Sequence, residues 1–107
     1  MGLKGGGPLN LIGRKTRPIV ILTALPDKVS AEKIAFLLVE AQLAACVNIL
    51  PRCQSIYRWQ GTVETANEVP LLIKTAAANY PALEEAIRSR HPYAVPEIIA
   101  FPVARGL

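Results

Sequence analysis

The sequence contains few of the residues and motifs that catalysis or membrane insertion requires. Its 107 residues include one histidine and two cysteines, with no Gly-x-Ser-x-Gly elbow, phosphate-binding glycine loop or dinucleotide-binding fingerprint. The longest apolar run, residues 34–39, is far shorter than the roughly 18 residues of a membrane-spanning helix. We therefore expect a protein that is not an enzyme and has no membrane partner.

Cysteine is too scarce for a disulfide framework. Cys46 and Cys53 are seven residues apart and form no Cys-x-x-Cys motif. On an unbroken strand this odd spacing places them on opposite faces, whereas a bulge near Pro51 would change that. Cys46 is expected to be a small buried hydrophobe rather than a metal ligand. Both thiols are expected to be free, in a reducing, cytoplasmic compartment.

The net positive charge does not extend over the part of the chain that is expected to fold. The formal charge is +4, but residues 27–107 carry equal numbers of basic and acidic side chains. Nucleic-acid binding needs a basic stripe on a folded surface, so no nucleic-acid partner is expected. Residues 1–17 are predicted to be a flexible basic tail or a cloning-derived leader, and residues 18–107 a single domain.

Apolar side chains are abundant for so short a chain. Hydrophobic residues make up 51% and charged residues 19%, compared with about 25% charged residues in typical soluble domains. A domain of this size buries about 60–70% of the surface of its unfolded chain. The apolar surface that is left over is therefore expected to contact another copy of the chain.

The first half of the chain predicts a strand, a helix and a long hairpin. A β-branched run over residues 18–24 indicates a buried strand, and a helix with Ser30 at its N-cap follows. From residue 46 to residue 74, apolar residues alternate on both sides of a turn at Gln60-Gly61. This alternation is typical of a long β-hairpin with one apolar face.

The second half adds one helix and one strand, which completes a recognisable order. Asn79 is predicted to cap a helix with Pro81 in its first turn, and residues 97–101 form the last strand. The order β-α-β-β-α-β predicts an α+β ferredoxin-like plait. Its four-stranded antiparallel sheet carries two helices on one face.

Several side chains are candidates for binding. His91, at the end of the second helix, is predicted either to satisfy the last helical carbonyls or to bind a ligand or metal. Tyr57 and Trp59, near the hairpin tip, are expected to pack across strands or against another subunit. Lys74 is expected either to hold an anion or to pair with a neighbouring glutamate.

Four segments, in their order and spacing, resemble the CutA divalent-cation-tolerance family, and the resemblance runs from about Ile19 to Leu107. The segments are Leu43–Asn48, Ser55–Gly61, Leu72–Thr75 and His91–Ile99. The resemblance implies a homotrimer similar to PII signal-transduction proteins, with hairpin strands paired across chains. It also implies a role in tolerance of copper and other divalent metals.

The same resemblance locates the family's copper-ligand positions in this sequence at Thr23, Arg90 and His91. Only His91 retains ligand chemistry, because a guanidinium has no free lone pair. The resemblance therefore implies at most a weak contact with copper or another divalent cation, and no required cofactor.

The sequence also allows a second function as an alternative to metal tolerance. A PII-like signalling or scaffold module would bind a small anion or a partner protein in the clefts between subunits. The residues predicted for such an inter-subunit pocket are Tyr57, Trp59, Lys74, Tyr93 and Glu97.

Overall fold

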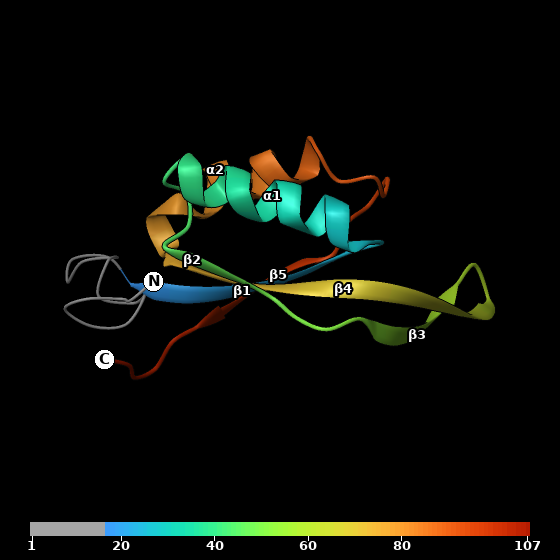
Figure 1. Ribbon diagram of the computed structural model, residues 1–107. Coiled ribbons are helices and arrows are strands. Elements are labelled where there is room, and N and C mark those ends of the chain that lie inside the picture. The colour runs from blue at the N-terminus through green and yellow to red at the C-terminus, as the bar shows by residue number, and fades with distance from the viewer. Residues whose placement is uncertain (1–16) are drawn as a thin grey trace.

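The computed structural model describes residues 17–107, so nearly all of the predicted tail lies outside the described residues. Five strands and two α-helices follow one another along the chain (Figure 1). They are β1 (Pro18–Leu25), α1 (Lys28–Glu40), β2 (Cys46–Ile49), β3 (Cys53–Trp59), β4 (Thr62–Ala76), the 3-10 turn η2 (Ala77–Asn79), α2 (Tyr80–Arg88) and β5 (Ile98–Pro102).

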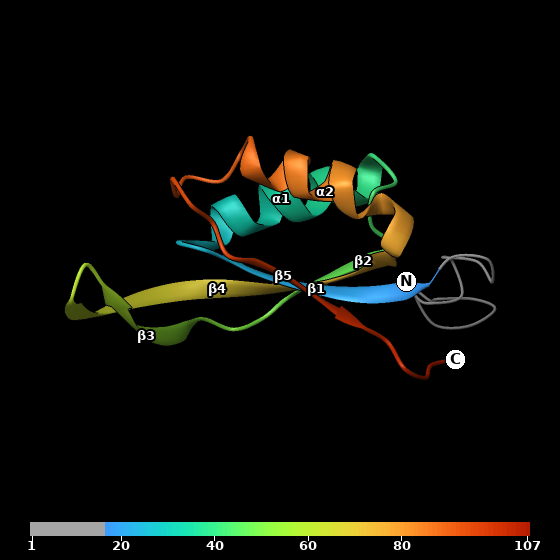
Figure 2. The same cartoon turned by 180° about the vertical axis from the view of Figure 1, so that it is seen from behind.

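The strands form one antiparallel sheet with both helices on the same face. The order across the sheet is β2-β4-β1-β5, and β3 pairs with the far half of β4. Figures 1 and 2 show α1 and α2 side by side on one side of the sheet, while no helix covers the other side. The predicted ferredoxin-like α+β plait is therefore confirmed.

The sheet has five strands and not the predicted four, because the second strand is interrupted around Pro51. Proline has no backbone N–H to donate to the ladder. Ile49 pairs with Leu71 and Cys53 pairs with Glu68, so three residues face two residues of β4 across the break. This extra residue is the bulge that the sequence allowed for.

The bulge changes where the two cysteines point. Cys46 lies opposite Lys74 and Cys53 lies opposite Glu68, and directly opposed residues share a face of the sheet. Both thiols are therefore on the helix-free face, which confirms the alternative that the sequence left open for a bulge near Pro51. Their partners on β4 are about 20 Å apart along the strand, and both cysteines are free.

The core lies between the helices and alternate residues of the two central strands. Ile21, Leu71 and Ile73 are fully buried on the sheet side, and Leu38 and Leu83 are fully buried on the helices. The alternation follows from the strand period of two, which directs every second side chain to the helix-covered face.

The ends of the helices differ in detail from the sequence prediction. Asp27, not Ser30, is the N-cap of α1: its carboxylate accepts the Ser30 N–H at 2.7 Å. The carboxylate of an extended residue just before the helix is a suitable acceptor for the free N–H groups of the first turn. Asn79 does precede α2 as predicted, but its amide donates to the Thr75 hydroxyl at 3.2 Å instead of capping the helix.

The β3–β4 hairpin extends as an arm beyond the helix-covered part of the sheet (Figure 2). The described residues measure 47 × 26 × 24 Å, and the arm accounts for the long dimension. Its tip turns at Gln60 and Gly61, which have positive φ angles of 49° and 80°. Two such residues in succession are typical of the tight hairpin turn that the sequence predicted.

We expect Leu38→Ala to destabilise the protein by about 3 kcal/mol, because it removes a fully buried side chain and leaves a cavity. Phe36→Ala on the same helix is the matched control, since Phe36 is 69% exposed and its loss should change stability by about 0.5 kcal/mol or less. Urea unfolding followed by circular dichroism measures both. Equal losses for the two variants would contradict this assignment of the core.

Candidate functional site

His91 is a buried link between the segment after α2 and the first strand. It is 8% exposed, and its Nε2 lies 2.6 Å from the carbonyl oxygen of Ala24. The backbone N–H of Tyr93 donates to Nδ1 at 3.1 Å. Because Nδ1 accepts, the neutral ring carries its proton on Nε2 and donates it to Ala24. Both ring nitrogens of His91 are therefore used in hydrogen bonds within the chain.

Tyr93 connects the same segment to the arm. Its hydroxyl donates to Oε2 of Glu68 at 3.0 Å, while the Ser55 hydroxyl donates to Oε1 of that carboxylate at 2.6 Å. Burial and the Glu68 carboxylate raise the pKa of Tyr93 to about 12. The neutral phenol thus joins the segment after α2 to both strands of the arm at its base.

The three copper-ligand positions implied by the resemblance do not form a metal site in this chain. Thr23 is fully buried and its hydroxyl donates to the carbonyl of Glu97 at 2.7 Å. Arg90 is exposed, and its Nη1 donates to the Ser89 hydroxyl at 3.0 Å. Within residues 17–107, no group of three or more His, Cys, Asp or Glu side chains is placed to hold a metal ion. The residues present do not fit a tight copper centre.

The residues predicted to share a pocket are spread over the chain. Tyr57 pairs with Glu64, ten residues before Lys74 on β4, which is about 33 Å of extended strand. Trp59 is at the tip of the arm and 58% exposed, and the side chain of Glu97 is also exposed. One chain alone therefore does not bring Tyr57 and Trp59 to Lys74.

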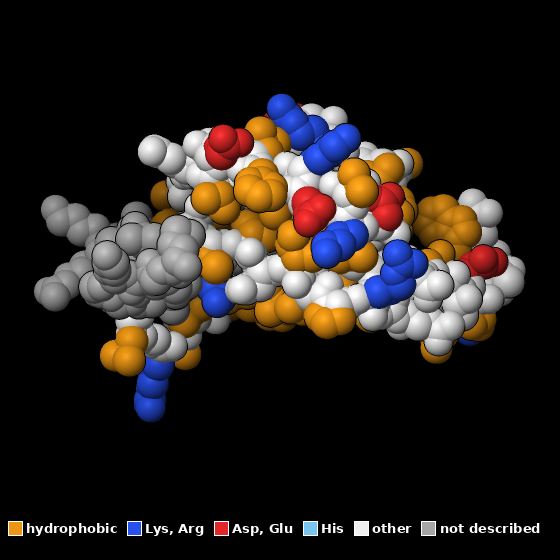
Figure 3. Space-filling model, viewed as in Figure 1, with side chains coloured by type: hydrophobic (Ala, Val, Ile, Leu, Met, Phe, Trp, Pro, Cys, Tyr) orange, Lys and Arg blue, Asp and Glu red, His pale blue; other side chains and the backbone are white. Residues whose placement is uncertain are grey.

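The helix-free face of the sheet is predominantly apolar. The apolar side chains that the register places on this face, over the three neighbouring strands β4, β1 and β5, include six that lie together. They are Val20, Leu22, Pro70, Leu72, Ile99 and Phe101. Ile99 is 39% exposed and Phe101 is 47% exposed, and Figure 3 shows hydrophobic side chains along the sheet on the side away from the helices. We call these six residues the apolar sheet face.

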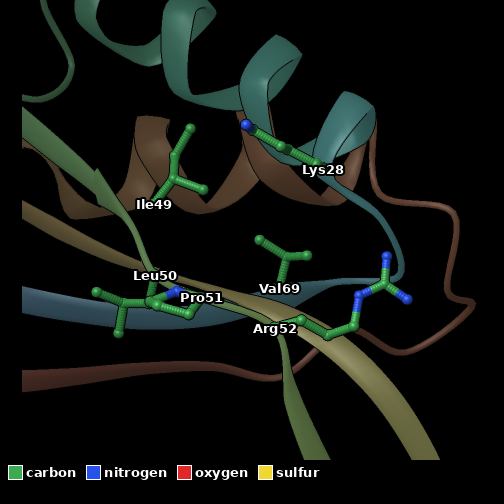
Figure 4. A pocket seen from close by; sticks show the side chains of 6 residues that line it. All are labelled: Lys28, Ile49, Leu50, Pro51, Arg52 and Val69. Carbon is green, nitrogen blue, oxygen red and sulfur yellow. The ribbon is translucent and has the colours of Figure 1, made fainter.

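A basic hollow that sequence reasoning missed lies beside the break between β2 and β3. It has a volume of about 370 Å³ and a floor of aliphatic side chains that includes Ile49 and Val69. Lys28 reaches over it from the start of α1 and Arg52 from the break (Figure 4). No periodicity of the sequence indicated this pair, because the bulge places Arg52.

The fold and these features define a ferredoxin-like domain with an apolar sheet face, a protruding arm and no assembled metal centre within residues 17–107. The model of the family described as CutA1 divalent ion tolerance protein matches residues 19–107. The chain belongs to this family, and the resemblance drawn from the sequence is confirmed.

Similar proteins agree with this assignment. The chain is 51% identical to the divalent-cation tolerance protein CutA of Thermus thermophilus over 81% of this chain and 84% of that protein. It is 49% identical to protein CutA of Mus musculus over 76% of this chain, but it spans only 46% of the mouse protein. The Thermus thermophilus structure matches with a TM-score of 0.83 at 49% identity, covering 84% of this chain and 87% of that one.

One similar structure is described by its location in the cell. A structure from Archaeoglobus fulgidus, 36% identical with a TM-score of 0.81 over 84% of this chain and 87% of that one, is described as a periplasmic divalent cation tolerance protein. None of the helices formed by residues 17–107 is both long and apolar enough to span a membrane.

We expect Tyr93→Phe to destabilise the protein by about 1 kcal/mol at neutral pH, because it removes the hydrogen bond to Glu68. Because the pKa of Tyr93 is higher in the folded chain than in the unfolded chain, the neutral phenol stabilises the fold below pH 10. This contribution is lost as the pH rises from about 10 towards about 12. The difference in stability between wild type and variant should therefore shrink over that range, as urea unfolding at a series of pH values would measure. A difference that stays constant over this pH range would contradict the assignment.

Proposed function

We propose that this chain acts in divalent-cation tolerance as a homotrimer, through assembly and weak metal contact rather than catalysis. The observation that carries the proposal is the apolar sheet face, which no element of residues 17–107 covers. Burial of apolar surface contributes about 25 cal/mol per Å², so a second copy of the same face is a favourable partner. Three copies correspond to the PII-like assembly that the resemblance implies.

The arm supports the same proposal. Its four large apolar side chains are all exposed, and no strand within residues 17–107 lies beside the outer edge of β3. These side chains are Ile56, Tyr57, Trp59 and Val63. An open strand edge with free N–H and C=O groups pairs readily with another chain. An assembly of this kind is also the arrangement in which Tyr57 and Trp59 of one copy could approach Lys74 of another.

Metal contact at His91 is weak in this proposal because the imidazole is already engaged. A cation that binds Nδ1 must replace the hydrogen bond from the Tyr93 N–H, and Nε2 is held by Ala24. Leaving a buried N–H without a partner costs about 1–3 kcal/mol, which reduces the affinity of any metal at this position.

We place the protein in the cytoplasm, which agrees with its free cysteines.

Leu72→Glu tests the assembly. Leu72 lies in the middle of the sheet, paired with Leu22 on one side and Asn48 on the other. Burying a carboxylate there costs about 4 kcal/mol, which weakens association about a thousandfold. Sedimentation velocity should show a trimer for wild type and a monomer for the variant.

Phe36→Glu is the matched control, because this side chain is exposed on the helix layer and should leave the trimer intact. Circular dichroism of Leu72→Glu distinguishes a folded monomer from an unfolded chain. A wild-type protein that sediments as a folded monomer at low concentration would refute the proposal, whatever the variants do.

Titration with copper or zinc tests the metal contact. We expect small changes in the His91 imidazole resonances and in Tm for wild type, with no saturation at equimolar metal. His91→Gln should abolish the changes, whereas the double variant Thr23→Cys, Arg90→His should bind copper more tightly, because it supplies a thiolate and a second imidazole. Wild-type resonances and Tm that stay unmoved by both metals would refute a metal contact at His91.

A further inference from the structure

A second hollow lies within the helix layer, between α1 and the segment that follows α2. Its volume is about 460 Å³, within the size range of small-molecule sites. We call it the interhelix hollow, and it is lined by Ser30, Lys33, Ile34, Leu37, Arg90 and Pro92. The four residues from α1 follow the spacing i, i+3, i+4 and i+7, which places them on one face of the helix.

The lining combines positive charge with an apolar wall. Lys33 and Arg90 supply two cations, and none of the six lining residues is acidic, while Ser30 bonds the Asp27 carboxylate next to the hollow. Ile34, Leu37 and Pro92 supply the apolar surface. An inorganic ion would use the cations alone, whereas a ligand with an anionic head and an apolar body would use both.

Arg90 is held in a defined position beside this hollow. Its Nη1 donates to the Ser89 hydroxyl at 3.0 Å and lies 3.5 Å from the carbonyl oxygen of Ala86. Both contacts use Nη1. The N–H groups on Nε and Nη2, which lie along another edge of the guanidinium, are left for a ligand. Two parallel N–H donors of this kind match the two oxygens of a carboxylate.

The backbone that carries Arg90 and Pro92 is also anchored. The N–H groups of Arg90 and His91 both donate to the carbonyl of Ile87, at 3.1 and 2.8 Å. The His91 side chain, between the two lining residues, is bonded to Ala24 of β1. A site whose wall is fixed before binding loses less entropy when the ligand arrives.

We propose that the interhelix hollow binds a small organic carboxylate with a compact apolar body, such as an aromatic ring. The Nε and Nη2 donors of Arg90 bind the carboxylate, Lys33 adds positive charge, and the apolar wall packs against the body. The site requires no metal. It therefore goes beyond the proposed function and does not depend on it.

The interhelix hollow lies on the opposite side of the sheet from the apolar sheet face. α1 and α2 lie on the side of the sheet opposite to the apolar sheet face (Figures 1 and 2). Lys33, Arg90 and Pro92 are exposed, and Figure 3 shows Lys and Arg side chains beside hydrophobic ones on the helix layer. Covering the apolar sheet face alone would thus leave the hollow accessible to a carboxylate.

The other basic hollow, beside Lys28 and Arg52, is a weaker candidate. The hydrogen bonds from Ser30 and, to a smaller extent, the charge of Arg52 lower the pKa of Asp27, so this carboxylate offsets part of the Arg52 charge. Arg52 also belongs to the bulge at the base of the arm, directly before β3, whose outer edge is proposed to pair with another copy.

Binding of benzoate, with benzamide as an uncharged probe of the same shape, tests the proposal. Backbone NMR shifts of the wild-type protein should move saturably with benzoate in residues 30–37 and 90–92, and should stay unchanged with benzamide. Arg90→Gln should weaken benzoate binding about tenfold, the loss expected for a charge-assisted hydrogen bond. Lys33→Gln should weaken it about threefold, as expected for an exposed charge.

Arg88→Gln is the matched control, because Arg88 is an exposed arginine at the end of α2 that does not line the hollow, and its variant should bind like wild type. Equal Tm values show that the variants stay folded. The proposal is overturned by an absence of saturable shifts, by equal binding of benzamide, by equal weakening in Arg88→Gln, or by a loss in Arg52→Gln in place of Arg90→Gln.

Discussion

The architecture depends on a difference in length: β4 is longer than the part of the sheet that the helices cover. α1 and α2 cover one face, and β1 pairs with β4 only from Val69 to Ala76. The 15 residues of β4 therefore extend beyond the core, and β3 pairs with the excess to form the arm. No element of residues 17–107 covers the apolar side chains on the other face and on the arm, which is why assembly is central to the proposed function.

His91, a predicted metal contact, makes hydrogen bonds within this chain through both of its ring nitrogens. In this chain the imidazole joins the segment after α2 to β1, and Tyr93 joins that segment to Glu68 on the arm. These two bonds hold the loop after α2 in place through hydrogen bonds within the protein. Arg90, beside this anchored residue, projects to the helix layer, where its positive charge suits an anion.

Local patterns predicted most of the fold, and their errors have physical causes. Alternation of apolar residues identified the strands and the hairpin turn at Gln60 and Gly61, because the strand period is a local property. The N-cap was misplaced by three residues because Asp27 and Ser30 are both good caps, and only the backbone geometry chooses between them. The shared face of the cysteines required the register against β4, which a break at Pro51 shifts by one residue.

The sequence by itself determined the order of the elements and the excess of apolar surface, since both follow from residue identity and short-range spacing, while the loss of ligand chemistry at Thr23 and Arg90 is what the family resemblance implied. The tertiary structure alone decided that both nitrogens of His91 are engaged and that Arg90 stands beside Lys33. The His91 side chain bonds a carbonyl 67 positions away in the sequence. Contacts over such separations arise from the packing of helices on the sheet, which no local periodicity encodes.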